Sequence, residues 1–461
     1  MSFNDDEPLT PAGRLFTQPA THQIINCALG LDHPIEYDAV RTVVSNSLMI
    51  KHPRFTSLLV KDNNDHEYWR KIDLDIDQHI IMHNDPVVQD YDTDESAINE
   101  YLADLSVSSP LCTDKPLWEI HILSVHKCIV VRIHHALGDG ISLMSLMLTL
   151  CKKLDKPDEV PTIEPLVSSS TARCGILLKA VRLLKIIWYT LVYMIHFILR
   201  ITVVDDGQTM VKGGQGVELW PRKLATAKFG IDDMKIVKKS VKNATINDVL
   251  FGVISLGLSK YLDNRSPGSL KEGLQITGVA LVNLRPSPGL QDMKELMKKN
   301  TGLGWGNKFG IMLLPVYYHK NDSDPLQYLK RAKAMIDRKK LSLEAFLSYQ
   351  TGYFIMKFLG AKYASLINYR VVCNTSFTVS NIVGPREEFT IAGIPVTYIR
   401  VTSTSLPQAI TMHMVSYAGK ADMQILVAKD LIPDPENLAK CFENALLEMK
   451  EATVQIREKS L

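Results

Sequence analysis

The chain has 461 residues, more than one hydrophobic core usually fills, so its length predicts two domains or one large duplicated unit. Its apolar content of 46% and charged content of 22% are typical of a packed globular protein and argue against a disordered one. Because 52 Lys and Arg residues nearly balance 50 Asp and Glu residues, the charge gives no indication of a nucleic-acid partner.

The seven cysteines argue against a disulfide framework and a structural zinc site, because their number is odd and no two have the C-x-x-C spacing. A reducing compartment is therefore expected. Residues 1–8 are acidic and lack the apolar core of a secretory signal, so we expect no cleavable signal there.

From about residue 21 to residue 150, short apolar runs alternate with helical ones. The run 117–124 alternates with a period of roughly two, whereas 128–133 is apolar apart from Arg132, as a central strand would be. The expected elements are strands at 24–29, 117–124 and 128–133, and helices near 37–49, 95–105 and 141–150.

The middle of the chain contains a linker and a hydrophobic segment. Residues 152–170 are rich in Pro, Asp, Glu and Ser, which predicts an exposed crossing between two halves. The segment 176–204 is the most lipid-like part of the sequence. Its last 19 residues, 186–204, have about the minimum length that spans the ~30 Å core of a bilayer.

The second half, from about Val217, repeats the alternation. Thr245-Ile-Asn-Asp248 has the form of a capping box and predicts a helix that runs to about Leu262. Further strands are expected at 274–284, 309–318, 375–383, 396–402 and 422–428, with helices at 325–339, 343–367 and 435–451. The prediction is a mixed α/β protein divided into residues 1–165, a linker of 166–215 and residues 216–461.

The most informative motif is His134-His135-Ala-Leu-Gly-Asp139-Gly140, which lies between a predicted strand and a predicted helix. A histidine at a rigid strand end suits general-base catalysis, because an imidazole with a pKa of about 7 accepts a proton from a hydroxyl. Asp139 either holds the other ring nitrogen of His135 or locks the turn through a buried arginine. The glycines permit the backbone bend. The alternative is a core histidine followed by an ordinary Asp-Gly turn.

A metal site is a weaker interpretation of this motif, because adjacent histidines on a strand point to opposite faces and no third ligand lies at helical spacing. The sequence also lacks the G-x-S-x-G elbow of serine hydrolases and the G-x-x-x-x-G-K-[ST] phosphate loop. The remaining chemistry is direct transfer by a histidine base, without a covalent enzyme intermediate.

Seven segments carry a family resemblance, and they occur in order along the chain. They are Pro8–Phe16, Asp114–Glu119, His134–Ser142, Thr245–Val249, Asn283–Pro286, Gly306–Gly310 and Ser380–Pro385. On these motifs the chain resembles the wax ester synthase/diacylglycerol acyltransferase family, in its plant branch, within the CoA-dependent acyltransferase superfamily that carries HHxxxDG. A rival plant family of soluble alcohol and phenol acyltransferases has D-F-G-W-G near its C-terminus. This chain has Gly302-Leu-Gly-Trp-Gly306, which is too early and lacks the Asp-Phe.

The resemblance implies a two-domain fold like that of chloramphenicol acetyltransferase, with mixed β-sheets flanked by helices and an active-site tunnel between the halves. It implies transfer of a fatty acyl group from acyl-CoA to a long-chain alcohol, and also to diacylglycerol, with no bound cofactor or metal. The alternatives are a CoA acyltransferase for smaller soluble alcohols and a non-catalytic lipid-binding protein.

The resemblance also implies roles for the motif residues. His135 is the general base, and His134 supports the loop. Asp139 is structural and pairs with a buried arginine, with Gly140 beside it in the motif. The candidates for that arginine are Arg54 and then Arg14.

Three further groups are candidates for substrate binding. Pro116-Leu117-Trp118 resembles a family element associated with acyl or alcohol binding, although an edge strand that begins with Pro and carries a core Trp explains it equally well. Asn247 and Asp248 are explained by helix capping, and the resemblance suggests a role at the active-site face. Ser380 and Asn381 end a strand, where they either donate to an oxyanion or simply form a turn.

The hydrophobic segment near 186–204 must let both halves meet at the active site. We therefore expect it to lie in the cytosolic leaflet, with Lys179, Arg182 and Lys185 on anionic head groups and Arg200 snorkelling at the other end. The alternatives are an ordinary transmembrane helix and a buried core helix. The expected location is the endoplasmic reticulum membrane, or the plasma membrane, with the active site facing the cytosol. The expected partners are acyl-CoA, fatty alcohol, diacylglycerol and membrane lipid.

Overall fold

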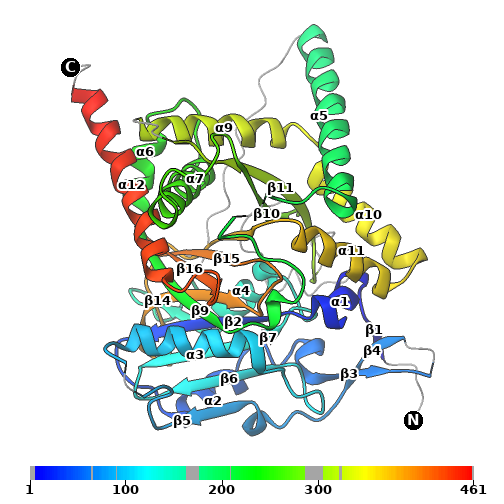
Figure 1. The fold of residues 1–461 in the computed structure, drawn as a ribbon. Helices are drawn as coiled ribbons and strands as arrows, with labels where there is room; N and C mark the ends of the chain where they lie inside the picture. The colour runs from blue at the N-terminus through cyan, green and yellow to red at the C-terminus, as the bar shows by residue number, and fades with distance from the viewer. Residues whose placement is uncertain are drawn as a thin grey trace.

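The described residues form two large β-sheets and a small one, with helices packed around them (Figure 1). The computed structural model describes residues 6–63, 66–89, 91–161, 176–207, 209–285, 305–320 and 324–458. In spatial order, the seven-stranded sheet contains β5 (Ile80–His83), β6 (Trp118–Leu123), β7 (Cys128–His134), β2 (Ile24–Leu31), β14 (Ile394–Ser403), β13 (Phe389–Ile391) and β8 (Cys151–Lys153). The six-stranded sheet contains β11 (Phe309–Tyr317), β10 (Gln275–Asn283), β12 (Phe377–Val383), β15 (Ile410–Tyr417), β16 (Lys420–Ala428) and β9 (Arg222–Gly230). The small sheet contains β1 (Glu7–Pro8), β4 (Glu67–Lys71) and β3 (Ser57–Lys61).

The seven-stranded sheet combines strands from both halves of the sequence. β2 pairs antiparallel with β7 on one side and with β14 on the other, so Cys27 lies opposite Val131 and Val401. β7 is buried along its whole length, as expected for a central strand. The predicted division at residues 165 and 216 stays a prediction about domains, but this sheet crosses it.

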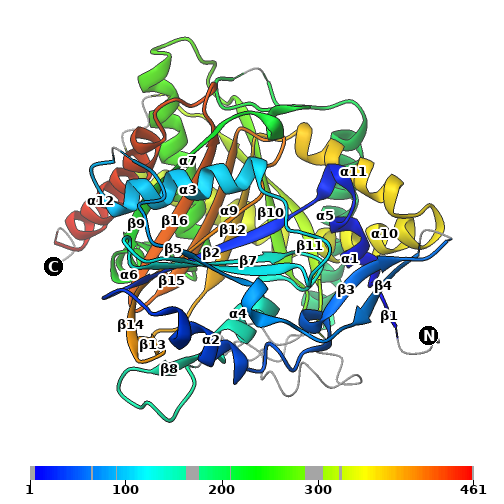
Figure 2. The same ribbon diagram turned by 90° about the horizontal axis from the view of Figure 1, so that it is seen from below.

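Helices pack around the two large sheets, and α4 (Gly140–Leu148) lies between them (Figures 1 and 2). Besides α4, the helices include α1 (Pro11–Phe16), α2 (Tyr37–Ser45), α3 (Asp94–Ser108), α6 (Ile231–Lys238), α7 (Ile246–Arg265), α9 (Pro325–Lys340) and α12 (Pro435–Glu458). α7 begins with the predicted capping box, in which the Thr245 hydroxyl accepts from the Asp248 amide and the Asp248 carboxylate accepts from the Thr245 amide. Phe251 and Phe442 of α7 and α12 fill the core beside the six-stranded sheet.

The helix predicted at 343–367 is two helices, α10 (Glu344–Phe358) and α11 (Ala361–Cys373). Gly360 takes a φ of +88°, a backbone angle that ends the first helix and that glycine adopts without strain. The exposed crossing predicted at 152–170 lies partly outside the described residues. Its first two residues belong to β8, which pairs with β13.

α5 (Ile176–Thr202) occupies most of the hydrophobic segment, and its N-terminal part stands away from the body (Figure 1). Within the described ranges, Leu177–Thr202 is the one helix long and apolar enough to cross a membrane, by length and composition. Only 11% of its most apolar window is buried inside the protein, so the alternative of a buried core helix is wrong.

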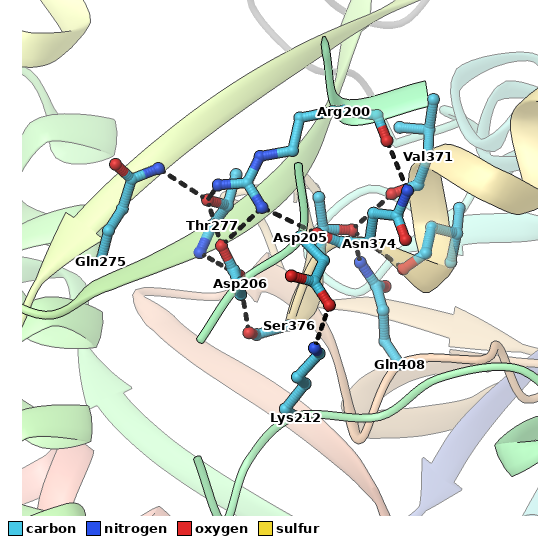
Figure 3. Close-up of polar contacts among 12 residues, drawn as sticks. Arg200, Asp205, Asp206, Lys212, Gln275, Thr277, Val371, Asn374, Ser376 and Gln408 are labelled. Carbon is cyan, nitrogen blue, oxygen red and sulfur yellow. Dashed lines mark hydrogen bonds and ion pairs between the residues drawn. The ribbon is translucent and has the colours of Figure 1, made fainter. Parts of the chain in front are cut away.

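A buried ion pair fixes the C-terminal end of α5 to the six-stranded sheet (Figure 3). Arg200 Nη1 lies 2.8 Å from Asp206 Oδ1, and the guanidinium donates to Thr277 Oγ1 at 2.7 Å and to the Asn374 carbonyl at 2.8 Å. Asp206 also accepts from the Thr277 amide at 2.6 Å and from Ser376 Oγ at 2.7 Å. The expected snorkelling of Arg200 is therefore wrong, because its charge is neutralised inside the protein.

Candidate active site

The two adjacent histidines at the end of β7, His134 and His135, have different surroundings. His134 is buried, its Nδ1 accepts from the Ala136 amide at 3.1 Å, and its ring lies edge-on to His22 with centroids 4.7 Å apart. His135 instead lines a cavity. Side chains alternate between the faces of a strand, which explains why one histidine reaches the cavity and its neighbour does not.

His135 lies where two cavities adjoin, one of about 210 Å³ and one of about 110 Å³. The residues that line both are Gln23, His135, Leu281, Phe309, Thr378 and Leu406. Apolar side chains extend the larger cavity between the sheet and α4, among them Cys27, Val131, Met144 and Met147. The smaller cavity is bounded by α1, β11 and α11, which contribute Phe16, Ile311 and Val372. Two separate cavities therefore reach one imidazole.

The surroundings of His135 favour its neutral form. Phe16 stacks on the imidazole with centroids 4.0 Å apart, and Phe309 lies at 6.0 Å. Burial lowers the pKa of His135 below its ordinary value, while the Asp139 charge and Asn307 oppose this with smaller effects. A neutral imidazole is the form that accepts a proton, so His135 is equipped to act as a base.

Asp139 fixes the turn that carries His135. Its Oδ1 accepts from the Ser142 amide at 3.0 Å, which caps α4, and its Oδ2 accepts from the Lys308 amide at 3.0 Å. Its ion-pair partner is Arg285, whose Nη1 lies 2.6 Å from Oδ2. Of the two alternatives for this aspartate, the contacts favour a turn locked through a buried arginine.

The arginines expected to pair with the motif aspartate pair elsewhere. Arg54 Nη2 lies 2.9 Å from Glu7 Oε1, and Arg14 Nε lies 2.8 Å from Glu67 Oε2. Both expectations are wrong, because carboxylates of the small sheet neutralise these two arginines. The actual partner, Arg285, lies in one of the family-like segments, but sequence separation gave no indication of the contact.

Gly140 is the first residue of α4 and lines the larger cavity. A Cβ atom at this position would lie 3.2 Å from Ile382 Cδ1, and one at Gly138 would lie 3.2 Å from the Trp305 ring. Neither glycine has a positive φ. Close approach of neighbouring side chains, rather than the expected backbone bend, therefore accounts for these glycines.

Pro116-Leu117-Trp118 lies away from both cavities, and none of the three residues lines either one. Trp118 is fully buried, its indole donates to the Phe55 carbonyl at 2.9 Å, and its ring stacks on His79 with centroids 4.0 Å apart. These contacts favour a core tryptophan at the start of β6 over direct substrate binding. The expected edge strand is wrong, because β6 pairs with β5 on one side and β7 on the other.

Ser380 and Asn381 of β12 line the larger cavity, whereas Asn247 and Asp248 do not. Asp248 is buried in the capping box of α7. Asn247 Oδ1 accepts from Asn381 Nδ2 at 2.7 Å, so Asn247 orients a cavity-lining amide without lining the cavity itself. The structure thus brings two of these four residues to the cavity of His135.

Besides Arg285, sequence reasoning missed two residues of the site. His413, on β15, lies opposite Ser380 and lines the larger cavity, where burial and the nearby His135 lower its pKa to about 4. Asn307 donates to the His135 carbonyl at 2.9 Å and belongs to a family-like segment. In the part of the chain that the structure describes, no group of three His, Cys, Asp or Glu side chains is arranged to hold a metal ion.

Comparison with known proteins gives one family. Residues 31–250 match the wax ester synthase/diacylglycerol acyltransferase catalytic domain, and residues 305–450 match the WS/DGAT C-terminal domain. Wax ester synthase/diacylglycerol acyltransferase 11 of Arabidopsis thaliana is 32% identical, over 98% of this chain and 96% of its own length. The relative numbered 4 in the same species is 34% identical, over 98% of this chain and 91% of its own.

Solved structures with a similar fold match this chain over nearly its whole length. A wax ester synthase/diacylglycerol acyltransferase from Marinobacter aquaeolei VT8 has a TM-score of 0.58 at 15% identity, over 97% of this chain and 99% of that one. Trichothecene 15-O-acetyltransferase from Fusarium sporotrichioides has a TM-score of 0.56 at 13% identity, over 97% and 95%. The expected fold, that of CoA-dependent acyltransferases with two pseudo-domains, is confirmed. The chain therefore belongs to the wax ester synthase/diacylglycerol acyltransferase family and is an O-acyltransferase.

Proposed function

We propose that this enzyme transfers a fatty acyl group from acyl-CoA to a long-chain alcohol, forming a wax ester, and to diacylglycerol, forming triacylglycerol. The observation that carries the proposal is the position of His135 between two adjoining cavities. We assign one cavity to each substrate. Relatives named for both activities match nearly the full chain, which supports these substrate classes.

In the proposed reaction, His135 is the general base. Its neutral imidazole removes the proton of the acceptor hydroxyl while the oxygen attacks the thioester carbonyl. A C–O bond forms, and the tetrahedral intermediate then collapses with cleavage of the C–S bond. The CoA thiolate leaves and takes the proton from the imidazolium. Ester and CoA thiol are released, and His135 is neutral again. The reaction therefore needs only acyl-CoA and the acceptor alcohol.

Ser380 is the proposed donor to the oxyanion of that intermediate. Ser380 lines the larger cavity together with Asn381, whose side-chain amide donates a hydrogen bond to Asn247. Because removal of one such donor costs about 10²–10³ in kcat, Ser380→Ala is expected to lower kcat by about a hundredfold or more. Ser45→Ala, on the outer helix α2, is the control. A Ser380→Ala enzyme with the kcat of the wild type would remove Ser380 from the mechanism.

The larger cavity is the proposed site of the acyl chain. Its lining is mostly apolar, with Cys27, Val131, Met144 and Met147 at the side next to α4. Such a lining suits a fatty acyl chain, because burying methylene groups beside it removes them from water. The acceptor then approaches through the smaller cavity.

Expression in a yeast strain that makes no neutral lipid tests the substrate classes. Cells fed a fatty alcohol are expected to accumulate wax ester, and triacylglycerol is scored in the same extracts. Cells that contain folded enzyme but neither product would contradict the proposal. Esters of short soluble alcohols alone would favour the smaller-alcohol alternative.

We further propose that α5 lies in the cytosolic face of the endoplasmic reticulum membrane. Lys179, Arg182 and Lys185 are exposed near its start and suit anionic head groups. Its other end is held in the protein through Arg200. Protease-protection mapping in microsomes is expected to find epitopes near residues 140 and 250 on the cytosolic side. Epitopes on opposite sides of the membrane would contradict this placement.

A further inference from the structure

α10 and α11 expose aromatic side chains to solvent. Phe354 and Phe358 are 61% and 62% exposed and lie against each other with centroids 4.3 Å apart, and Tyr363 is 59% exposed. The inner side of the same helices is already packed, since Met356 is buried beside Leu15. A helix on a soluble protein normally presents polar residues at such outward positions.

This exposure is concentrated on one side of the molecule. About half of the exposed large hydrophobic side chains among the described residues lie on α5, α10 and α11. Figures 1 and 2 show these three helices on the same side, and the Leu343 amide before α10 donates to Thr190 Oγ1 of α5 at 3.0 Å. We call the exposed hydrophobic side chains of these helices the apolar face. An apolar surface of this extent marks an interaction site.

The charges around the apolar face are positive. α5 has no acidic residue, and the single acid of α10 and α11, Glu344, is buried 2.7 Å from Lys339 Nζ. The exposed basic residues are Lys179, Arg182, Lys185, Lys357, Lys362 and Arg370. Apolar side chains edged by cations complement a bilayer of anionic phospholipid, whose acyl region takes the former and whose head groups attract the latter.

The base of α5 is tied to the end of α11 by the network of Figure 3. Arg200 donates to the Asn374 carbonyl at 2.8 Å, and Asn374 Nδ2 donates back to the Arg200 carbonyl at 2.5 Å. A buried ion pair with Asp206 completes the joint. The joint therefore fixes the C-terminal end of α5 beside the end of α11.

α11 extends from the apolar face to the cavity beside the proposed catalytic histidine. Its outer side carries Tyr363 and Leu366, which are 59% and 53% exposed. Its inner side contributes Asn368, Tyr369 and Val372 to the smaller cavity, which His135 also lines. A lipid that leaves the bilayer at α11 would reach the base without crossing water.

We propose that α10 and α11, together with α5, dock on an anionic phospholipid surface, and that the long-chain acceptor passes from this surface into the smaller cavity beside α11. The inference rests on the proposed function and adds the side from which the acceptor arrives. It assigns α10 and α11 to the membrane contact, which length and composition indicate for α5 alone.

Quenching of tryptophan fluorescence by brominated lipid tests the docking in the full-length protein. In a Trp188→Phe background, which removes the exposed indole of α5, Phe358→Trp reports on α10. Leu447→Trp, at a 47% exposed position of α12, is the matched control. Vesicles of dibrominated phosphatidylcholine with phosphatidylserine are expected to quench about half of the emission that Phe358→Trp adds, because that indole would lie at the acyl boundary.

The emission that Leu447→Trp adds is expected to stay unquenched. Equal quenching of the two indoles, or none at Phe358→Trp, would overturn the docking of α10. The latter result would leave a protein partner as the occupant of the apolar face. Quenching that does not require phosphatidylserine would overturn the anionic part of the proposal.

A kinetic comparison tests the route of the acceptor. The double variant Phe354→Asp, Phe358→Asp is compared with Leu447→Asp, Ile456→Asp on exposed positions of α12. For a long-chain alcohol dissolved in vesicles, the first variant is expected to raise the apparent KM about tenfold or more. Its rate with a short water-soluble alcohol is expected to equal that of the wild type.

Equal losses with both acceptors, or no loss with either, would overturn the proposed route. A parallel loss in the α12 variant would overturn it as well, because added charge alone would then explain the effect. If the wild-type enzyme esterifies neither acceptor, the proposed function itself fails. Failure of the further inference looks different: the wild type is active with both acceptors, and the α10 variant has the same KM and rates as the wild type.

Discussion

Asp139 and Arg285 hold the catalytic turn from positions far apart in the sequence. Arg285 is fully buried and donates to Asp139, to Ser142 Oγ at 3.0 Å and to the Gly306 carbonyl at 2.6 Å. The guanidinium thus joins the motif to the segment that carries Asn307. Its counter-ion is Asp139, so we propose that the aspartate serves the architecture of the turn rather than proton transfer.

Asp139→Asn is therefore expected to lower the free energy of unfolding by about 3 kcal/mol, because it leaves a buried guanidinium without its counter-ion. Turnover is expected to fall as well, since the turn holds His135. Asp77→Asn, in the exposed pair with Arg41, is the control and should unfold like the wild type in urea. An Asp139→Asn enzyme as stable as the wild type, but slow, would assign the aspartate a purely catalytic role.

The pKa of His135 predicts the acid side of the rate profile. Burial lowers this pKa below the ordinary value of 6.5, so the imidazole is neutral at pH 7 and becomes protonated only at lower pH. We expect kcat/KM to fall with acid at a midpoint that lies below pH 6.5. The contribution of the neutral ring to stability has the same sign: it is present above pH 6.5 and is lost as the pH falls through the lowered pKa.

An acid limb at or above pH 6.5 would show that the base titrates in an unburied or anion-stabilised setting, contrary to the structure. The measurement uses acyl-CoA and a soluble alcohol between pH 4 and pH 8. A separate check at each acidic pH shows that the enzyme is still folded. Burial also lowers the pKa of His413, to about 4, so this second cavity histidine is neutral at pH 7 as well.

At the scale of elements, the parts with a strong local pattern were predictable. The strand, turn and helix around His135 follow from an apolar run, a glycine-containing turn and a second apolar run, and β7 and α4 confirm them. β15 was missed although Ile410, Met412 and Met414 alternate with more polar residues and all three are buried. The split at Gly360 was missed because a glycine within a helical pattern does not reveal its φ.

α4 forms one wall of the larger cavity and offers a test of the acyl site. Met144→Trp is expected to fill part of the space beside His135, since Met144 lines the cavity and is buried. The ratio of kcat/KM for palmitoyl-CoA to that for acetyl-CoA should fall about tenfold or more, because a shortened cavity excludes methylene groups that would otherwise be buried. Acetyl-CoA is the internal control.

A changed preference for the alcohol chain, with the acyl preference intact, would contradict the assignment of this cavity to the acyl group. Met234, buried in the core beside the six-stranded sheet, provides the matched control Met234→Leu. That variant should leave both ratios unchanged.

At the scale of the whole molecule, the site exists only when both halves are folded together. β7 supplies His135, while β10, β12 and β15 lead to Arg285, Ser380 and His413. The histidine motif and the other family-like segments could be identified in the sequence. The contacts between them could not, because an ion pair or a cavity across more than a hundred residues leaves no local pattern. Arg54 and Arg14 show the consequence, since both were plausible by type and both pair with carboxylates of the small sheet.

The measurement that tests the central claim most directly is acyl transfer by His135→Ala, compared with His134→Ala, in enzyme whose folding is checked by thermal unfolding. We predict that His135→Ala loses about 10²–10⁴ in kcat while melting like the wild type, because a base is removed from a cavity wall. His134→Ala is predicted to melt earlier but to keep its turnover per folded molecule, because its buried ring contacts the Ala136 amide and His22 rather than substrate. A His135→Ala enzyme with wild-type rates, or the reverse ranking of the two variants, would contradict general-base catalysis by His135.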